Sequence, residues 1–374
     1  MAALDDLCGL LSVASARGAT TPPPARQSAV LAAANAALLT PALHLALIDA
    51  DHGAGWHADT RAVIAGFFEM NRARNALLAD QLAEAASAMN GVGVRPLLLK
   101  GSAELVGADD RRRGRRVITD LDLQVSEETA PAIERALAAI GYGRLRGYAD
   151  NPHAHAVADL TRAGDGAAID LHRELLSYAG HRGGRAHLAG LLHPDAVRAP
   201  AAVVRFRGAE LLLPAPEDRM LHLILQDQIQ DRDHFAGRLK LRRLRDLAEL
   251  LAAHPDVDTE ALVANLRPYG LAGAAVSHLY AAHALFDAPI PKTLRRDPAA
   301  RLQHLRRRVV AGHPGAAAAS ALVGALAYEF ARCRFPPGVP TGTLLRWRLQ
   351  RLGQVLRKRR FGVAAQVHDV AARL

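Results

Sequence analysis

The stretch that decides the fold is TDLDLQV (Thr119–Val125), which places two acids inside what otherwise reads as a buried strand. Side chains alternate faces along a strand, so Asp120 and Asp122 project one way while Leu121 and Leu123 project the other. Like charges side by side on one strand face repel each other. A divalent cation shared by the two carboxylates would remove that repulsion, so the pattern indicates a metal site.

A third acid lies on a strand further along the chain. The runs His153–Thr161 and Ala167–Glu174 predict a hairpin, and Asp170 interrupts the apolar second strand. If that strand pairs beside the first stretch, three carboxylates converge on one sheet face. Hard oxygen ligands suit Mg²⁺, and ions shared by such acids clamp phosphoryl or nucleotidyl transfer. His172 shares the face of Asp170 and is expected to orient a carboxylate or contact substrate, or to be an ordinary packed histidine.

The segment before these acids predicts a phosphate cradle. The run Arg95–Lys100 reads as a short strand that leads into Gly101 and Ser102 at the start of a helix. Gly101 allows close backbone approach, the helix start offers free N–H groups, and Ser102 adds a hydroxyl. Lys100 is within reach of a phosphate, and Arg116 is placed to hold a phosphate or a carboxylate. The alternatives are an ordinary strand–helix turn and solvated surface charges.

The remainder of the chain predicts helices on both sides of a compact α/β core. We expect an N-terminal helical region at 1–90, the core at 91–215 and a C-terminal helical domain at 216–374. Within the core, Ser126 is the expected N-cap of a helix that ends at Ile140. The other expected elements are a linker at Ala19–Arg26, strands at Val203–Phe206 and Glu210–Leu213, and helices at Gln27–Asp49, Asp59–Met89, Glu217–Gln230, Leu239–Ala253, Glu260–Leu266, Ala272–Phe286 and Ala316–Cys333.

Composition limits the class of protein. The chain has 374 residues, half of them hydrophobic, and a net charge of +10 that comes from arginine and suits a polyanionic partner. Cys8 and Cys333 form no motif, which argues against a disulfide framework or a thiolate metal site. Asp5 and Asp6 interrupt the apolar N-terminus, so we expect no signal peptide, no transmembrane segment and a cytoplasmic location.

In order, these motifs resemble the "uncharacterised nucleotidyltransferase" family of bacterial proteins, within the DNA polymerase beta-like nucleotidyltransferase superfamily. The resemblance rests on LLLKGSAEL, RRVITDLDLQV, ALAAIGYG and AIDLHREL, and it covers about residues 60–255. It implies an α+β fold with a polymerase-beta-like core, a mixed sheet with helices, flanked by helical regions. Members of that family occur beside peptide natural-product genes such as lasso-peptide clusters.

The resemblance also implies a reaction. A nucleoside monophosphate would move from a nucleoside triphosphate, such as ATP, to an acceptor, with release of pyrophosphate. Asp120 and Asp122 would bind Mg²⁺ or Mn²⁺, Asp170 would bind metal or act as general base, and Gly101 and Ser102 would hold the triphosphate. The acceptor would be a small molecule or a peptide. The loop DDRRRGRR before the acids departs from the family pattern and favours an acidic or phosphorylated acceptor.

Two other functions stay open at the level of sequence. One is a toxin-like nucleotidyltransferase that acts on tRNA or another RNA, favoured by the arginine-rich loop and by the basic helix expected at Leu344–Arg360. The other is a non-catalytic binding protein on the same fold. His153 and His155 are spaced for one strand face but lack an evident third metal ligand. A further polar group is expected to be solvated surface, with the acceptor pocket as the alternative: His222, Asp227, Asp231, Asp233 and His234.

Overall fold

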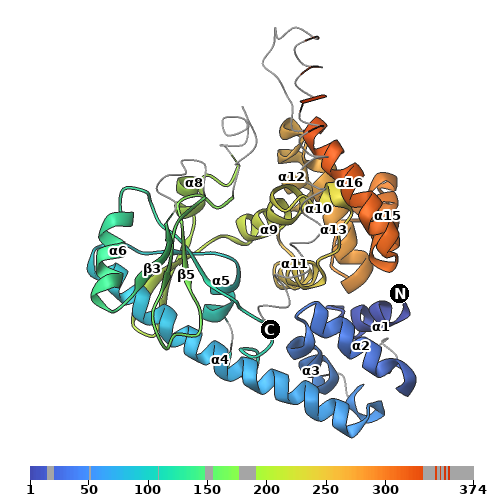
Figure 1. Cartoon of the computed structure of the whole chain (residues 1–374), viewed down its shortest axis with the longest axis horizontal. Coiled ribbons are helices and arrows are strands. Elements are labelled where there is room, and N and C mark those ends of the chain that lie inside the picture. The colour runs from blue at the N-terminus through green and yellow to red at the C-terminus, as the bar shows by residue number, and fades with distance from the viewer. Residues whose placement is uncertain are drawn as a thin grey trace.

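The computed structural model describes residues 1–14, 21–49, 52–107, 109–147, 155–176 and 191–331, with isolated positions 342, 346, 349, 350 and 353. Within these residues a mixed sheet of seven strands lies on one side of the molecule and a helical body on the other (Figure 1). The expected α+β fold with helical flanks is therefore confirmed. In this part of the chain no helix has the length and hydrophobicity needed to cross a membrane.

The sheet has the strand order β3-β4-β5-β2-β1-β7-β6. Two neighbouring pairs, β1 with β7 and β2 with β5, are parallel, and the other pairs are antiparallel. Alternate residues of β4 are buried, as expected for a strand with one face in a core, whereas every residue of β2 is buried. The strands are β1 Leu97–Leu98, β2 Leu121–Gln124, β3 Gly143–Gly147, β4 Ala156–Thr161, β5 Ile169–His172, β6 Ala202–Phe206 and β7 Ala209–Leu213.

Three helices complete the sheet core. The C-terminal half of the long helix α4 (Ala58–Gly91) contributes Leu78, Leu82 and Met89 to an apolar cluster beneath the sheet. That cluster also takes up Leu121 and Leu123 of β2, whose burial leaves the acids of the strand on the opposite face. Helices α5 (Lys100–Gly107) and α6 (Ala130–Ala139) contribute its remaining walls.

The helical flanks form one body, because helices from both ends of the chain share one hydrophobic core. In it Leu7 and Leu43 of the N-terminal helices belong to the same cluster as Leu247 and Phe286 of the C-terminal ones. Helix α9 leads from the sheet into this body (Figure 1). Its helices are α1 Ala2–Leu10, α2 Pro24–Ala36, α3 Thr40–Asp49, α9 Pro216–Leu225, α10 Asp233–Ala236, α11 Leu241–Ala253, α12 Thr259–Asn265, α13 Ala272–Phe286, α14 Lys292–Arg295, α15 Pro298–Gly312 and α16 Pro314–Ala331. The short helix α8 (Pro194–Arg198) precedes β6.

Shorter turns complete the described chain. They are 3₁₀ turns at His52–Gly55 and Arg267–Tyr269 and a π-helical turn, η3, at Gln226–Gln230 directly after α9. A π turn holds one extra residue and often occurs at functional sites.

Several sequence predictions need correction. The strand expected over Val117–Val125 is confined to β2, and the strand expected over Arg95–Lys100 is confined to β1, with Lys100 already in α5. Helix α6 begins at Ala130, because Ser126 forms a turn in which its hydroxyl oxygen accepts from the Thr129 N–H at 3.3 Å.

Other expectations fail where a helix is broken or a segment has weak periodicity. The helix expected at Gln27–Asp49 is two helices, and the expected linker partly belongs to α2, since a proline suits the first turn of a helix. Strand β3 and helix α15 were not predicted. The expected hairpin and the strands at Val203–Phe206 and Glu210–Leu213 are confirmed. Cys333, His153 and almost all of Leu344–Arg360 lie outside the described residues.

Candidate functional site

The junction between β1 and α5 has an unusual backbone. Lys100 has a φ of +46°, in the left-handed region, which costs a residue with a side chain about 1–2 kcal/mol. Backbone strain of this kind is concentrated at functional sites. From this position the Lys100 ammonium reaches β2, where its Nζ lies 2.5 Å from Oδ1 of Asp122. The lysine of the expected phosphate cradle is therefore tied to one of the expected metal ligands.

Gly101 and Ser102 follow Lys100. The first has no side chain, and the hydroxyl of the second has no hydrogen-bond partner among the described residues. A Cβ on Gly101 would clash with Nη1 of Arg116 and lie 3.2 Å from Cγ2 of Ile118, so only glycine lets these groups approach the backbone. Ser102 is fully buried, and its Oγ has no hydrogen-bond partner among the described residues. A buried hydroxyl without a partner is rare in proteins, which makes Ser102 a candidate contact for a ligand.

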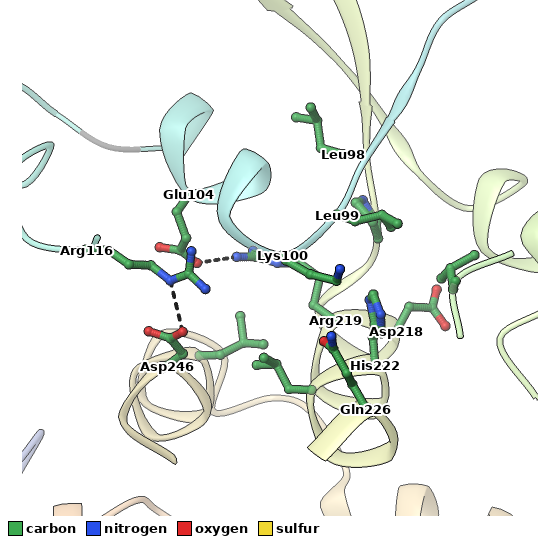
Figure 2. Close-up of a pocket in the computed structure, with 14 residues that line it drawn as sticks. Leu98, Leu99, Lys100, Glu104, Arg116, Asp218, Arg219, His222, Gln226 and Asp246 are labelled. Carbon is green, nitrogen blue, oxygen red and sulfur yellow. Dashed lines mark hydrogen bonds and ion pairs between the residues drawn. The ribbon is translucent and has the colours of Figure 1, made fainter. Parts of the chain in front are cut away.

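Arg116 is fixed from two sides. Its Nε lies 2.9 Å from Oδ2 of Asp246 on α11, as Figure 2 shows, and its backbone carbonyl accepts from Asn75 of α4 at 2.8 Å. Burial would lower the pKa of Arg116, but the charges of Asp246 and Glu104, with the hydrogen bond to Asp246, together outweigh burial and raise it. Because Asp246 uses Nε, the terminal nitrogens remain beside Gly101, where a phosphate in the cradle would meet them.

Three of the other four arginines of the expected basic loop also have acidic partners, and Arg112 is the exception among the described ion pairs. Arg115 pairs with Glu104 of α5 at 3.2 Å and with Glu249 of α11 at 2.7 Å. Arg113 and Arg111 pair with Asp110 and Asp49. The loop therefore joins the sheet to the helical body more than it exposes positive charge to a partner.

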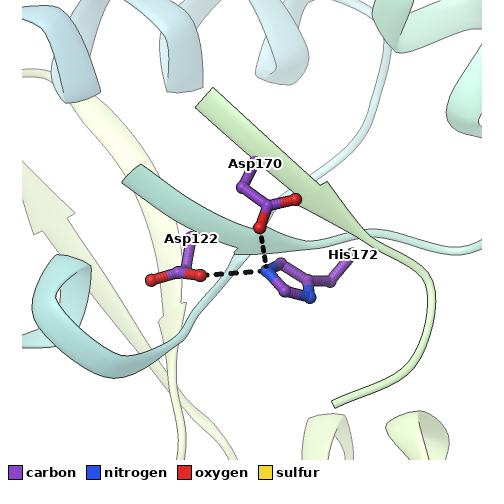
Figure 3. A group of neighbouring side chains, drawn as sticks. All are labelled: Asp122, Asp170 and His172. Atoms are coloured by element: carbon purple, nitrogen blue, oxygen red, sulfur yellow. Dashed lines mark hydrogen bonds and ion pairs between the residues drawn. The ribbon is translucent and has the colours of Figure 1, made fainter. Parts of the chain in front are cut away.

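The acids of β2 and β5 meet as the hairpin pattern predicts. The two strands run parallel with Asp122 beside Asp170 and Gln124 beside His172. Figure 3 shows the His172 ring between the two carboxylates, with Nε2 at 2.9 Å from Asp122 and 3.0 Å from Asp170. Ionised carboxylates only accept hydrogen bonds, so Nε2 must carry a hydrogen.

The electrostatics of this cluster keep both carboxylates ionised. Burial would raise the pKa of Asp122, but the charge of Lys100 and the hydrogen bond from His172 hold it well below its usual value. Burial is likewise outweighed by His172 at Asp170, whose pKa is also lowered. In return, the pKa of His172 is raised by its two hydrogen bonds against the effect of burial.

The cluster fits a divalent cation. Ligand atoms of Asp122, Asp170 and His172 lie within 4.8 Å of one another. Oδ1 of Asp170 is buried and has no hydrogen-bond partner among the described residues, so this acid has coordination capacity to spare. Carboxylate oxygens suit Mg²⁺ or Mn²⁺, and His172, which donates through Nε2, would orient these oxygens.

Asp120 lies outside this cluster of ligand atoms. It precedes β2, and its carboxylate accepts a hydrogen bond from the Thr119 hydroxyl at 2.8 Å. Burial, and then the charge of Asp122, raise its pKa. The structure therefore brings together Asp122 and Asp170, with Asp120 as their neighbour in sequence at the entrance of the strand.

The structure also changes the interpretation of several histidines and acids. The His155 ring stacks 5.0 Å from that of His172, and burial is the main cause that lowers its pKa to about 4. His222, Asp227 and Asp233 are 5%, 1% and 1% exposed, so the prediction that they form solvated surface is wrong. Apolar periodicity alone could not identify these residues, because it assigns the buried side of an amphipathic helix to apolar side chains.

The sequence matches the model of a known protein family. The model of a family described as "Uncharacterised nucleotidyltransferase" matches residues 23–287, which is well over half of the chain. A search of curated proteins finds no match.

Proposed function

Because the chain belongs to this family of nucleotidyltransferases, we propose that it is a metal-dependent enzyme that transfers a nucleoside monophosphate from a nucleoside triphosphate to an acceptor. The acceptor oxygen or nitrogen would bond to the α-phosphorus, the bond to the β-phosphate would break, and pyrophosphate would leave. The observation that carries the proposal is the in-register pair of Asp122 and Asp170 beside Lys100 and the unpartnered hydroxyl of Ser102.

The position of each residue in the site indicates its role in the proposed reaction. Asp122 and Asp170 would hold Mg²⁺ or Mn²⁺, with Asp120 beside them, and the ion when bound would neutralise charge on the reacting phosphate. The low pKa of Asp170 makes it a weak base at neutral pH, so we assign it to the metal and not to proton transfer.

The phosphate side of the site would be built on α5. The Ser102 hydroxyl, the Lys100 ammonium and the terminal nitrogens of Arg116 would contact the triphosphate. Asp246 keeps the Arg116 guanidinium in place before a substrate binds, so little order has to be created on binding. His172 would position the two metal-binding carboxylates.

The RNA-directed alternative gains no support from the arginine-rich loop, and the basic helix that also favoured it lies almost entirely outside the described residues. Arg115 and Arg116 are paired with acids of the protein, so the loop does not supply the basic stripe toward the metal site that RNA binding would need. The acceptor class that we propose is a small molecule or a peptide. A cytoplasmic location stays a prediction.

Calorimetry of nucleotide binding tests the proposal. ATP, GTP, CTP and UTP are titrated with and without Mg²⁺ or Mn²⁺ into the wild type and into the double variant Asp122→Asn/Asp170→Asn. We expect metal-dependent binding of at least one triphosphate and its loss in the double variant. The matched control is Asp231→Asn, an acid of the helical body that should leave binding unchanged. A folded wild type that binds none of the four would overturn the enzymatic proposal and favour a non-catalytic role.

A further inference from the structure

A pocket adjoins the candidate metal cluster where the sheet meets the helical body. Its walls come from the β1–α5 junction, from α9 and from α11, and Figure 2 shows the polar side chains that line it. Lys100 belongs to both sites, because it lines this pocket and lies 2.5 Å from Asp122. The pocket is therefore next to the place where the proposed transfer would occur. Its apolar lining consists of Leu98, Leu99, Leu175, Pro214, Leu223 and Leu250.

The cations of the pocket are matched by carboxylates. Lys100 pairs with Asp122 at 2.5 Å, Arg116 with Asp246 at 2.9 Å, and Arg219 with Glu104 at 2.8 Å.

One acidic residue that lines the pocket has no cationic partner among the described residues. Asp218, in the first turn of α9, has no hydrogen bond or ion pair with any described residue. Burial, and then the charge of Glu217, raise its pKa. The charge that the described residues leave unmatched in this pocket is therefore negative.

A second polar group on α9 also lacks a partner. His222 follows Asp218 by four residues and so lies on the same face of the helix. It is 5% exposed, lines the pocket, and its Nε2 has no hydrogen-bond partner among the described residues. Burial, followed by the charge of Lys100, lowers its pKa to about 3, so the ring is neutral. A neutral imidazole exchanges hydrogen bonds with a hydroxyl in either tautomer.

We propose that this pocket, whose volume of about 30 Å³ admits one small group, binds a hydroxyl or ammonium group of the acceptor, which Asp218 and His222 contact. The proposal rests on the function proposed above, since it names the substrate class of that site. It differs from the expectation of an acidic or phosphorylated acceptor, because four of the five arginines that suggested such an acceptor are paired within the protein. An anionic acceptor would meet an unpaired carboxylate and be repelled.

Matched three-carbon probes test the charge preference. 1,3-Diamino-2-propanol, glycerol and malonate are titrated by NMR into the full chain saturated with Mg²⁺ and a non-hydrolysable triphosphate. We expect the diamine to bind best and malonate not to bind. Asp218→Asn should weaken the diamine about tenfold or more, as for the loss of a charged hydrogen bond, and His222→Phe should weaken both the diamine and glycerol.

Glu217→Gln is the control, because it removes the same charge from the neighbouring position, which is exposed and outside the pocket lining. Malonate binding as tightly as the diamine, or diamine binding that neither pocket variant changes, would overturn the proposal.

A further arm separates the acceptor from the nucleotide. In samples prepared without nucleotide, displacement of the bound diamine by added triphosphate, together with weaker triphosphate binding in Asp218→Asn, would assign the pocket to the nucleotide and overturn the proposal. Triphosphate binding to the wild type is measured in the same samples, so a failure of the proposed function shows there and not in the diamine titration.

Discussion

Two clusters of acids in this protein have similar composition and different surroundings. Asp122 and Asp170 meet on the sheet, and Asp227, Asp231 and Asp233 meet after α9 in the helical body. In the first cluster the Lys100 ammonium contacts Asp122, and both carboxylates accept a hydrogen bond from Nε2 of His172. In the second, Lys240 pairs with Asp231 and Asp233, Arg238 with Asp233 at 2.6 Å, and Arg243 with Asp227 at 3.2 Å.

The difference shows that the cations around a group of acids, more than the acids themselves, separate a ligand site from a structural one. Three positive side chains balance the three acids of the helical body, and the Lys240 ammonium occupies the place that a metal ion would need. Buried oxygens without a hydrogen bond occur in both clusters, but Asp227 and Asp233 each have an oxygen of this kind within 3.2 Å of a cation, whereas Oδ1 of Asp170 and Oγ of Ser102 have no ion pair among the described residues. We therefore assign the metal to the sheet and a structural role to the helical cluster.

The largest expected difference is in metal affinity. Asp122→Asn removes a charged ligand at nearly constant volume, so we expect Mn²⁺ affinity to fall at least about a thousandfold. Asp231→Asn should leave it within a factor of about two, because the acids of the second cluster already have cations. Electron paramagnetic resonance of free Mn²⁺ measures both, with circular dichroism to verify folding. Equal losses in the two variants would erase the distinction between the clusters.

A cation of the helical cluster should matter for stability. Arg243→Met leaves the buried Asp227 without its nearest cation, and breaking such a pair costs about 3 kcal/mol in the free energy of unfolding. The control is Arg72→Ala, whose pair with Glu69 is exposed on both sides and is worth about 0.5 kcal/mol or less. Urea unfolding at pH 8 measures both variants. A loss at Arg243 no larger than at Arg72 would contradict a structural role for this cluster.

The two clusters should respond to pH in opposite directions. Burial, opposed by Arg243 and Lys240, raises the pKa of Asp227 from 3.8 to about 7. Its contribution to stability is complete below about pH 4 and is lost as the pH rises through 7. The pKa of Asp122 is lowered, so its contribution is present above about pH 4 and is lost as the pH falls further.

Unfolding curves between pH 5 and 8 distinguish these contributions. Asp227→Asn should flatten the decline of stability over this range, because Asp227 itself titrates there. A wild-type slope that persists in Asp227→Asn would assign the titration to another group.

The smallest effect concerns the two glycines of α5. A methyl group at Gly101 would press on Arg116 and Ile118, and we expect Gly101→Ala to cost about 1–2 kcal/mol and to weaken triphosphate binding. Gly107→Ala meets nothing within 4 Å and should be neutral or stabilising by up to about 1 kcal/mol. Thermal unfolding with and without nucleotide compares them, and equal effects would remove the argument for a close approach at Gly101.

The local sequence pattern was sufficient to predict the central strands and the shared face of their acids. The alternation around Asp122 and Asp170 predicted their shared face, because a buried strand places alternate side chains on the same side. The sequence could not show that Asp120 precedes the strand, since strand ends depend on which neighbour continues the hydrogen bonds.

The sequence pattern could not predict contacts between segments that are distant in the chain. Arg116 and Asp246 are 130 residues apart, and no periodicity connects them. The same holds for the burial of His222, whereas the contact of His172 with a carboxylate was one of its expected roles. These features depend on how the sheet and the helical body pack, which is a tertiary property.

The arginine-rich loop has a consequence for any attempt to divide the protein. Arg115 and Arg116 reach Glu249 and Asp246 of α11, and Arg242 of that helix donates to the carbonyl of Val117 at 2.9 Å. A fragment that ends near residue 215 would keep the two arginines and lose these acids. The predicted domain limits at 90 and 215 are therefore poor sites for truncation, and we expect the sheet to be obtained in soluble form only when α11 is expressed with it.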